Sequence, residues 1–228
     1  MENLNAEKNV WNDYWGSLYN QTRKESYRDL ILDMGKKRLL GKNILDLGCG
    51  YQPIISSLPD QYFKKIYLDL SSGIELNHSN NANLFVRMDV HDLLNSHQKS
   101  YQKYMKKIFK FLGEDEFEIN EFTKENLYMD TIVYSDILNY IDYQQVFKKL
   151  YRFLRVGGRK IIFNKINMGI YELFSPLRPK SNWEILRFLQ MDLRMVIEFR
   201  KAAPIIWGNE NDFEQSCYIF VAKKKYPD

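Results

Sequence analysis

The residues best suited to chemistry are acids and glycines that accompany short apolar runs. The octapeptide Asn-Ile-Leu-Asp-Leu-Gly-Cys-Gly has Asp46 in an apolar run, with Gly48 and Gly50 directly after it. Glycine adopts backbone angles that a Cβ forbids, which lets the chain approach a ligand closely. Asp69 ends the next apolar run, where a carboxylate can accept charge-assisted hydrogen bonds from both hydroxyls of a ribose. Asp89 ends the third run, so three acids recur in register.

Two common nucleotide-binding signatures do not match this glycine turn. A dinucleotide-binding loop needs a third glycine, and Pro53 occupies its position, while the phosphate-binding Gly-Lys-Ser/Thr loop is absent from the sequence. Pro53 instead suits the first turn of a helix, because its fixed φ fits there and its missing N–H is not needed. Each acid has an alternative role as the N-cap of a following helix, although capping alone poorly explains three acids in register.

The glycine turn and the three acids can form one site only if their strands end at the same edge of a sheet. Short apolar runs alternate with helical patterns, which predicts an α/β fold: a doubly wound, seven-stranded, mostly parallel sheet with helices on both faces. Helical spacing of apolar residues predicts helices over residues 12–40, 145–154 and about 183–190. The predicted strands are residues 43–47, 65–70, 84–88, 131–135, 160–164, 195–199 and 216–222.

The glycine turn and the acids together resemble the class I S-adenosylmethionine-dependent methyltransferases, which have a Rossmann-like fold. The resemblance covers residues 43–164 and includes Arg155-Val156-Gly157-Gly158, where the family usually has Lys-Pro-Gly-Gly. It implies S-adenosyl-L-methionine as the cofactor, with Asp89 near the adenine amino group. The implied cofactor contacts are Asp46, Gly48, Cys49, Gly50, Asp69, Leu70, Asp89, Val90 and Ser135, with Tyr14 and Trp15 from the N-terminal segment.

The chain is interpreted as a single methyltransferase domain, residues 1–228, with three additions to the minimal fold. Residues 1–40 are expected to form an N-terminal helical lid, and residues 166–192 a cap segment on the acceptor side. Residues 93–128 are interpreted as a helical insertion after the third strand, because a structureless loop of that length is unusual in a compact domain. The alternative for the last two segments is that they only cover surface.

Three side chains are candidates for a general base. Methyl transfer from a sulfonium is an in-line displacement with an activated leaving group, so proximity and alignment supply most of the effect. A base is needed only for an acceptor that is protonated at the working pH. Asp136 and Tyr140 follow the fourth strand, and His91 lies just beyond the third. Asp136 has the alternative of capping a helix, His91 that of a solvated loop residue, and Tyr140 stands where many family members carry His.

Aromatic residues make up 15% of the chain and gather in two places outside the sheet. Residues 10–19 hold four rings that could fold over the cofactor and attract its sulfonium; alternatively they form the core face of a helix. The family usually builds acceptor specificity in the segment that holds the second group. We predict that both groups line one cavity at the carboxyl end of the sheet. The second group consists of Tyr171, Phe174, Trp183 and Phe188.

Composition restricts the partners. The chain has 33 Lys and Arg against 29 Asp and Glu, a formal net charge of +4, and the basic residues mostly alternate with acids, which argues against a nucleic-acid-binding face. Two cysteines and three histidines without C-x-x-C or H-E-x-x-H predict neither a disulfide framework nor a metal site. No apolar run reaches the roughly 18 residues of a membrane span. We expect a cytoplasmic monomer or homodimer that acts on a small-molecule acceptor.

The sequence favours methyl transfer to a small molecule, with oxygen favoured over nitrogen as the acceptor atom. One alternative is an RNA or protein methyltransferase, which would need an acceptor signature such as Asn/Asp-Pro-Pro-Tyr/Phe. The fourth strand offers Ser135-Asp136-Ile137-Leu138 instead. Another alternative is a non-catalytic S-adenosylmethionine-binding protein, since a fold does not determine an activity.

Overall fold

The computed structural model describes residues 18–50, 53–70, 78–95, 99–113, 129–166, 173–202 and 217–227. Within these ranges it forms a seven-stranded sheet in the order β3-β2-β1-β4-β5-β7-β6. The seven predicted strands are all present, although β5 begins six residues earlier than predicted. The strands are β1 (Asn43–Leu47), β2 (Lys64–Asp69), β3 (Asn83–Arg87), β4 (Met129–Ser135), β5 (Leu154–Lys165), β6 (Val196–Ala202) and β7 (Cys217–Lys223).

The strand order contains the reversal that creates a ligand site in doubly wound folds. β1 pairs in parallel with β2 on one side and with β4 on the other. The chain therefore leaves β1 toward one edge of the sheet and returns to its other side, which opens a crevice at the carboxyl ends of β1 and β4. The antiparallel strands β7 and β6 lie beyond β5, at the far edge.

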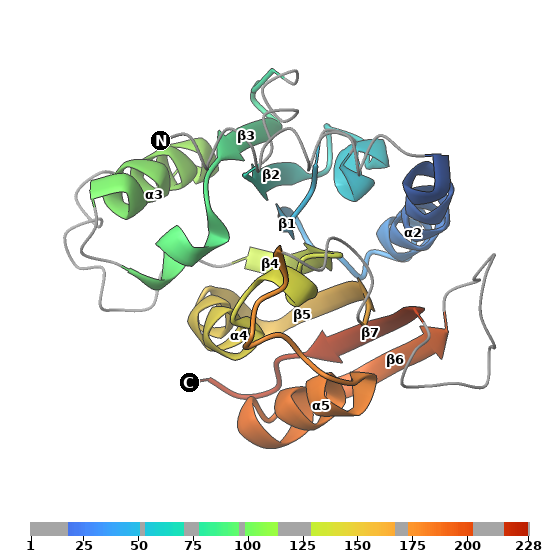
Figure 1. Ribbon diagram of the computed structural model, residues 1–228. Coiled ribbons are helices and arrows are strands. Elements are labelled where there is room, and N and C mark those ends of the chain that lie inside the picture. The colour runs from blue at the N-terminus through green and yellow to red at the C-terminus, as the bar shows by residue number, and fades with distance from the viewer. Residues whose placement is uncertain are drawn as a thin grey trace.

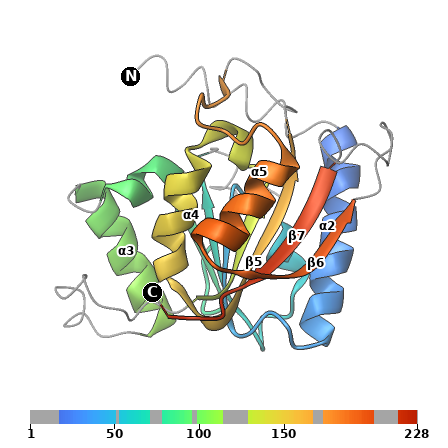
Figure 2. The ribbon, with the colours of Figure 1, turned by 90° about the horizontal axis from the view of Figure 1, so that it is seen from below.

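Helices cover both faces of this sheet. Figure 1 shows α3 (Lys99–Leu112) and α4 (Tyr143–Arg152) on one side and α2 (Leu18–Lys36) on the other, and Figure 2 shows the same layers from below. Two buried apolar clusters match these layers, one under α3, α4 and α5 (Asn182–Arg187) and one under α2. None of the described helices is long and apolar enough to cross a bilayer.

The helix α4 illustrates how local sequence sets an element. Asp142 caps its start by accepting a hydrogen bond from the Gln145 amide at 3.1 Å, as expected for an aspartate at an N-cap. The apolar stripe noted in the sequence faces the sheet, and Phe147 is fully buried. At the other end Lys224 donates to the Tyr151 carbonyl at 3.1 Å, which places a positive charge at the helix C-terminus.

The segment after the glycine turn differs from the prediction. Pro53 does not begin an α-helix; with ψ 144° it stands just before a single 3₁₀ turn, Ile54–Ser57. The turn ends at Leu58, which precedes Pro59, and a residue before proline is disfavoured in helical conformation. Ile54 and Ile55 are nevertheless fully buried. The short turn therefore covers the α2 face of the sheet where a longer helix was expected.

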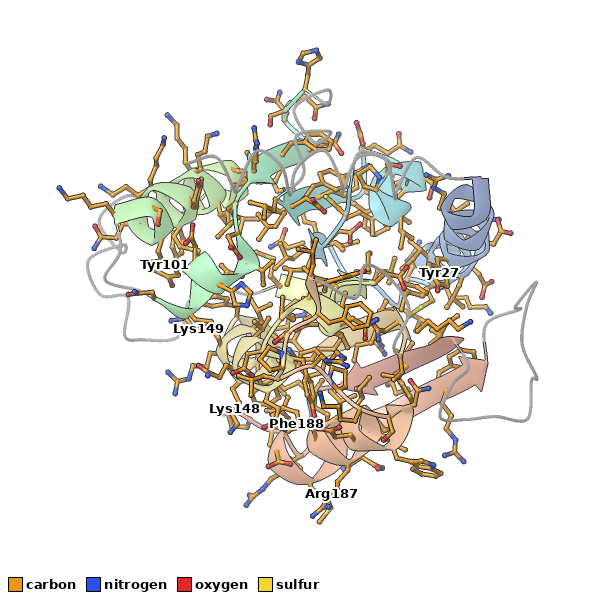
Figure 3. All side chains as sticks on the ribbon, viewed as in Figure 1. Tyr27, Tyr101, Lys148, Lys149, Arg187 and Phe188 are labelled. Carbon is orange, nitrogen blue, oxygen red and sulfur yellow. The ribbon has the colours of Figure 1, made fainter. Side chains whose placement is uncertain are left out.

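Two predicted additions are only partly covered by the described residues. The helical part of residues 93–128 is α3, whose apolar face packs on the sheet and which carries Tyr101 toward Lys149 of α4 (Figure 3). In the N-terminal part, α2 packs on a sheet face, where Tyr27 stacks on Phe163 with ring centroids 4.4 Å apart. Residues 1–17 and 114–128 lie outside the described residues, so the lid and the insertion stay predictions.

Replacing Lys64 with methionine is expected to lower the free energy of unfolding by about 1 kcal/mol. The Lys64 ammonium donates to the carbonyls of Phe111 and Leu112 at 3.0 and 2.9 Å, and so caps the C-terminus of α3 from β2. Urea unfolding measures the change, and hydrogen exchange should show reduced protection in the last turn of α3. Lys103→Met, on the exposed face of the same helix, is the control. Equal unfolding free energies for the two variants would contradict this role.

Candidate functional site

A buried acid and a hydroxyl join β1 to β4 at the reversal point. Asp46 is fully buried in β1, and the Ser135 hydroxyl at the end of β4 donates to its Oδ1 at 2.6 Å. These residues are 89 positions apart, and parallel pairing of the two strands brings them together. Buried carboxylates are stable only with hydrogen-bonding partners. The pair therefore holds the carboxyl ends of β1 and β4 in a defined arrangement.

The glycine turn passes directly over the exit of β4. Gly48 has φ +70° and Gly50 φ +62°, both in the left-handed region that favours glycine. A Cβ on Gly48 would lie 2.8 Å from the Ile137 Cβ and 2.9 Å from the Ser135 carbonyl oxygen. Cys49 between the glycines is fully buried. Both the backbone angle and the close approach therefore require glycine at position 48.

Asp69 is directed toward this turn. It ends β2, and its Oδ2 accepts a hydrogen bond from the Gly50 amide at 2.7 Å. The neighbouring Leu70 is half-buried. The sequence predicted that Asp69 and the glycines would lie at one site, and the structure does place them in contact. This contact places a carboxylate beside the backbone of the glycine turn.

Asp136 has an unusual backbone conformation at the exit of β4. Its φ is +55° although it is not glycine, and its side chain is 7% exposed. Its amide donates to the Phe163 carbonyl at 2.8 Å, which continues the pairing of β4 with β5. Strained residues of this kind cluster at functional sites, where surrounding structure holds them in place. This backbone conformation supports Asp136 as a functional candidate, and it could not be predicted from the sequence.

Asp89 has the capping role that was considered as an alternative. Its Oδ1 accepts from the His91 amide at 2.8 Å and lies 2.9 Å from the His91 Nδ1, at the start of the 3₁₀ turn Val90–Leu94. Burial alone would raise the pKa of Asp89, but the hydrogen bonds from His91 lower it below its usual value. The hydrogen bond to Asp89 in turn raises the pKa of His91. His91 is thus a half-exposed member of an ion pair.

The His91–Asp89 pair predicts a dependence of stability on pH. Since the folded-state pKa of His91 is raised, its contribution is complete below the unfolded value of about 6.5 and is lost as pH rises through the folded pKa. The urea midpoint of the wild type should therefore fall between about pH 6 and pH 8 by more than that of His91→Gln. His78→Gln, at another exposed histidine, should behave as the wild type. Parallel curves for the wild type and His91→Gln would contradict the pairing.

The cap segment docks on the exit of β4. Tyr140 meets Phe174 edge to face with ring centroids 5.5 Å apart, and the Ser175 amide donates to the Asn139 carbonyl at 3.0 Å. The Arg178 guanidinium lies 4.9 Å above the Phe174 ring. Two aromatic rings and a cation therefore gather at the turn that follows β4; that this is the acceptor side stays a prediction.

The prediction that the late rings line one cavity is wrong for two of them. Trp183 is 52% exposed, and Phe188 is buried in the core against Tyr143 and Phe147. Figure 3 shows Phe188 beside Lys148 of α4. Helical spacing from α5 onward turns Phe188 toward the sheet and Trp183 away from it. Tyr171, Tyr14 and Trp15 lie outside the described residues.

The predicted residues thus separate into two groups. The first lies together around the glycine turn and the β4 exit and consists of Asp46, Gly48, Cys49, Gly50, Asp69, Ser135 and Asp136. The second, Asp89, Val90 and His91, lies one strand further along, after β3. The sequence interpretation missed Asn164, which is buried near the end of β5; a polar residue that ends the apolar run Ile161-Ile162-Phe163 was the available signal. Within the described ranges, no cluster of three or more His, Cys, Asp or Glu could hold a metal.

Several solved structures share this architecture. The chain is similar to the CurJ carbon methyltransferase, with a TM-score of 0.57 and 13% identity over 92% of this chain and 56% of that one. It is also similar to the Burkholderia thailandensis 1,6-didemethyltoxoflavin-N1-methyltransferase, with a TM-score of 0.58 and 13% identity over 90% and 81% of the two chains. The magnesium protoporphyrin IX methyltransferase of Synechocystis PCC 6803 aligns over 96% and 95%, with a TM-score of 0.57 and 13% identity. These similarities show a Rossmann-like methyltransferase fold.

The family follows from the sequence match. Residues 12–176, more than half of the chain, match the ubiE/COQ5 methyltransferase family. The chain belongs to this family, and the predicted class, S-adenosylmethionine-dependent methyltransferase, is confirmed. No curated protein matches the chain. The chain spans little more than half of the CurJ carbon methyltransferase.

Proposed function

We propose that this protein transfers the methyl group of S-adenosylmethionine to a small organic molecule, with oxygen favoured over nitrogen as the acceptor atom. The observation that carries the proposal is the contact between the Asp69 carboxylate and the Gly50 amide at the reversal point of the sheet. It joins an acid suited to a ribose and a backbone that a ligand can approach closely. Ligands of doubly wound sheets bind in this crevice.

The residues of the first group have distinct roles in this proposal. Asp69 accepts hydrogen bonds from the ribose hydroxyls, and the turn at Gly48 and Gly50 lets the cofactor lie against main chain. The pair of Asp46 and Ser135 holds the turn and the β4 exit in place through its 2.6 Å hydrogen bond. The last two predicted contacts, Val90 through its amide and Leu70, would border the adenosine from neighbouring strand ends.

In this arrangement the Asp89 carboxylate would contact the adenine, and His91 would control its availability. Its carboxylate is engaged with the amide and ring of His91, so a hydrogen bond to the adenine amino group needs the His91 ring to turn away or to share the carboxylate. We therefore assign His91 to positioning Asp89 rather than to proton transfer from the acceptor. This leaves Asp136 and Tyr140 as the candidates for a base.

Asp136 is the better placed of the two. It lies at the β4 exit with only 7% exposure, beside the turn that the cofactor would approach. The cofactor supplies a methyl group on a positively charged sulfur. In the proposed step an acceptor oxygen forms a bond to the methyl carbon, the carbon–sulfur bond breaks in line, and the hydroxyl proton passes to the Asp136 carboxylate. Tyr140, with its ring against Phe174, would orient the acceptor.

The side chains gathered at the turn that follows β4 favour a flat acceptor. The rings of Tyr140 and Phe174 offer apolar surface, and the Arg178 guanidinium adds a positive charge above one of them. The similar Burkholderia thailandensis structure contains 1,6-didemethyltoxoflavin, and the similar Synechocystis enzyme is a magnesium protoporphyrin IX methyltransferase. Those compounds belong to those proteins; their flat rings support the same type of acceptor here.

Calorimetry with S-adenosylmethionine and S-adenosylhomocysteine tests the cofactor site directly. We expect both to bind the wild type, and no binding at millimolar concentration would contradict the proposal. Release of S-adenosylhomocysteine with separate panels of phenols, lactams and primary amides, amines, RNA and peptides then tests the acceptor class. Turnover only with RNA or peptides would favour the first alternative, and cofactor binding without turnover in any panel would favour a non-catalytic binding protein.

A further inference from the structure

Asn164 is a buried amide whose side-chain polar atoms have no partner among the described residues. It lies near the carboxyl end of β5, is 1% exposed, and neither its Nδ2 nor its Oδ1 has a hydrogen-bond partner among the described residues. A carboxamide has two N–H donors and an acceptor oxygen with two lone pairs. Buried polar groups almost always have partners, so an amide with both ends unpaired needs an explanation.

Two other buried asparagines, Asn83 and Asn139, show what a structural role looks like. The Asn83 amide donates to Asp60 at 2.9 Å, and its Oδ1 accepts from the Tyr67 hydroxyl at 3.0 Å. The Asn139 amide donates to the Lys165 carbonyl at 2.7 Å. Each of these side chains joins separate segments of the chain. Asn164 joins none within the described residues, although it is as deeply buried.

Asn164 also lies beside the proposed acceptor side. The preceding residue, Phe163, accepts a hydrogen bond from the Asp136 amide through its carbonyl, so Asn164 is at the level of Asp136. Phe163 stacks on Tyr27 of α2, and alternation along the strand turns Asn164 to the opposite face. The carbonyl of the next residue, Lys165, accepts a hydrogen bond from the Asn139 side chain. Asn139 belongs to the turn on which the cap segment docks.

We propose that Asn164 binds the methyl acceptor, and that the acceptor carries a hydrogen-bond donor and acceptor side by side, as in a lactam or a primary amide. Such a group satisfies both ends of the carboxamide at once, whereas a lone phenol hydroxyl satisfies one. The inference rests on the proposed function for the identity of the ligand as a methyl acceptor. Asn164 is an acceptor-binding residue in this proposal and takes no part in proton transfer.

The experiment measures binding of 2-pyridone and of phenol to the wild type and to Asn164→Leu. Both proteins are titrated by NMR with and without saturating S-adenosylhomocysteine. We expect 2-pyridone to bind the wild type and to bind Asn164→Leu at least 10-fold more weakly, while phenol and S-adenosylhomocysteine bind the two proteins equally. The matched control is Thr131→Val, which removes a buried hydroxyl bonded to the Leu40 carbonyl in another part of the sheet. It should leave 2-pyridone binding unchanged.

The stability of Asn164→Leu is a second readout. A ligand-binding role predicts an unchanged or higher urea midpoint, whereas a structural role predicts a lower one. Because Asn164→Leu removes an unpaired buried amide, its urea midpoint should equal or exceed that of the wild type. A lower midpoint, or failure to fold, would show that the fold uses the amide and would overturn the proposal. Equal binding of 2-pyridone to both proteins, or none to the wild type, would also overturn it. If the wild type did not bind S-adenosylhomocysteine, the proposed function would be contradicted instead. The 2-pyridone titration without S-adenosylhomocysteine would still show whether Asn164 binds this ligand.

Discussion

An Asp69→Ala variant is expected to bind S-adenosylhomocysteine roughly 10- to 150-fold more weakly than the wild type. Loss of hydrogen bonds to a charged group costs roughly 1.5 to 3 kcal/mol, and about 1.4 kcal/mol corresponds to a factor of ten in affinity. The variant loses the carboxylate that would hold the ribose. It also loses the hydrogen bond that ties the Gly50 amide to the end of β2. Isothermal titration calorimetry measures both the affinity and the enthalpy of binding.

Two further variants separate these contributions. Asp69→Asn can still accept the Gly50 hydrogen bond but carries no charge, so we expect an intermediate loss of affinity. Asp33→Ala removes the same formal charge from the exposed face of α2, where Asp33 pairs with Lys37, and should bind as the wild type does. Wild-type affinity in Asp69→Ala would remove the ribose assignment. Full affinity in Asp69→Asn with a loss in Asp69→Ala would assign Asp69 to shaping the turn alone.

Asp136→Asn is expected to lower the turnover number by roughly 10²- to 10⁴-fold, the usual contribution of a general base. S-adenosylhomocysteine affinity should stay unchanged, since the amide has the same shape. Asparagine tolerates the left-handed region as aspartate does, so the φ of +55° can be retained. Turnover is measured as release of S-adenosylhomocysteine with the best small-molecule acceptor found for the wild type. Retained turnover would show that Asp136 is not the base.

Asp136→Gly controls for the backbone conformation. Glycine relieves the cost of a positive φ, so this variant should be as stable as the wild type or more stable while being as inactive as Asp136→Asn. That combination would show that the strain is kept for function. If Asp136→Gly were markedly less stable, the Asp136 side chain would have a structural role, as the sequence interpretation had considered for a cap.

The β-strands illustrate which parts of the fold the sequence predicts well. Parallel strands buried on both faces are nearly continuous apolar runs, and the predicted run 43–47 coincides with β1. β5 began earlier than predicted because its first residues, Leu154–Gly158, include exposed side chains at a turn. Apolar runs mark the buried part of a strand, whereas strand pairing determines where the strand begins.

Side-chain directions were harder to predict. Phe188 and Trp183 both follow the same broken segment, yet one is core and the other is exposed. Aromatic residues serve a core and a pocket equally well, so composition does not separate the two. Asp89 likewise fits a helix cap and a ligand contact, and only the position of His91 shows that the cap is formed.

The sequence by itself determined the alternation of strands and helices, the glycine turn after β1 and the acids at the strand ends, because these depend on local periodicity and on backbone angles that few residues adopt. The tertiary structure decided which of those residues meet. Ser135 reaches Asp46 across 89 positions, Gly48 approaches Ile137, and Asn164 comes to the level of Asp136. These juxtapositions depend on strand order and register, which arise from packing the whole sheet and are written in no single segment.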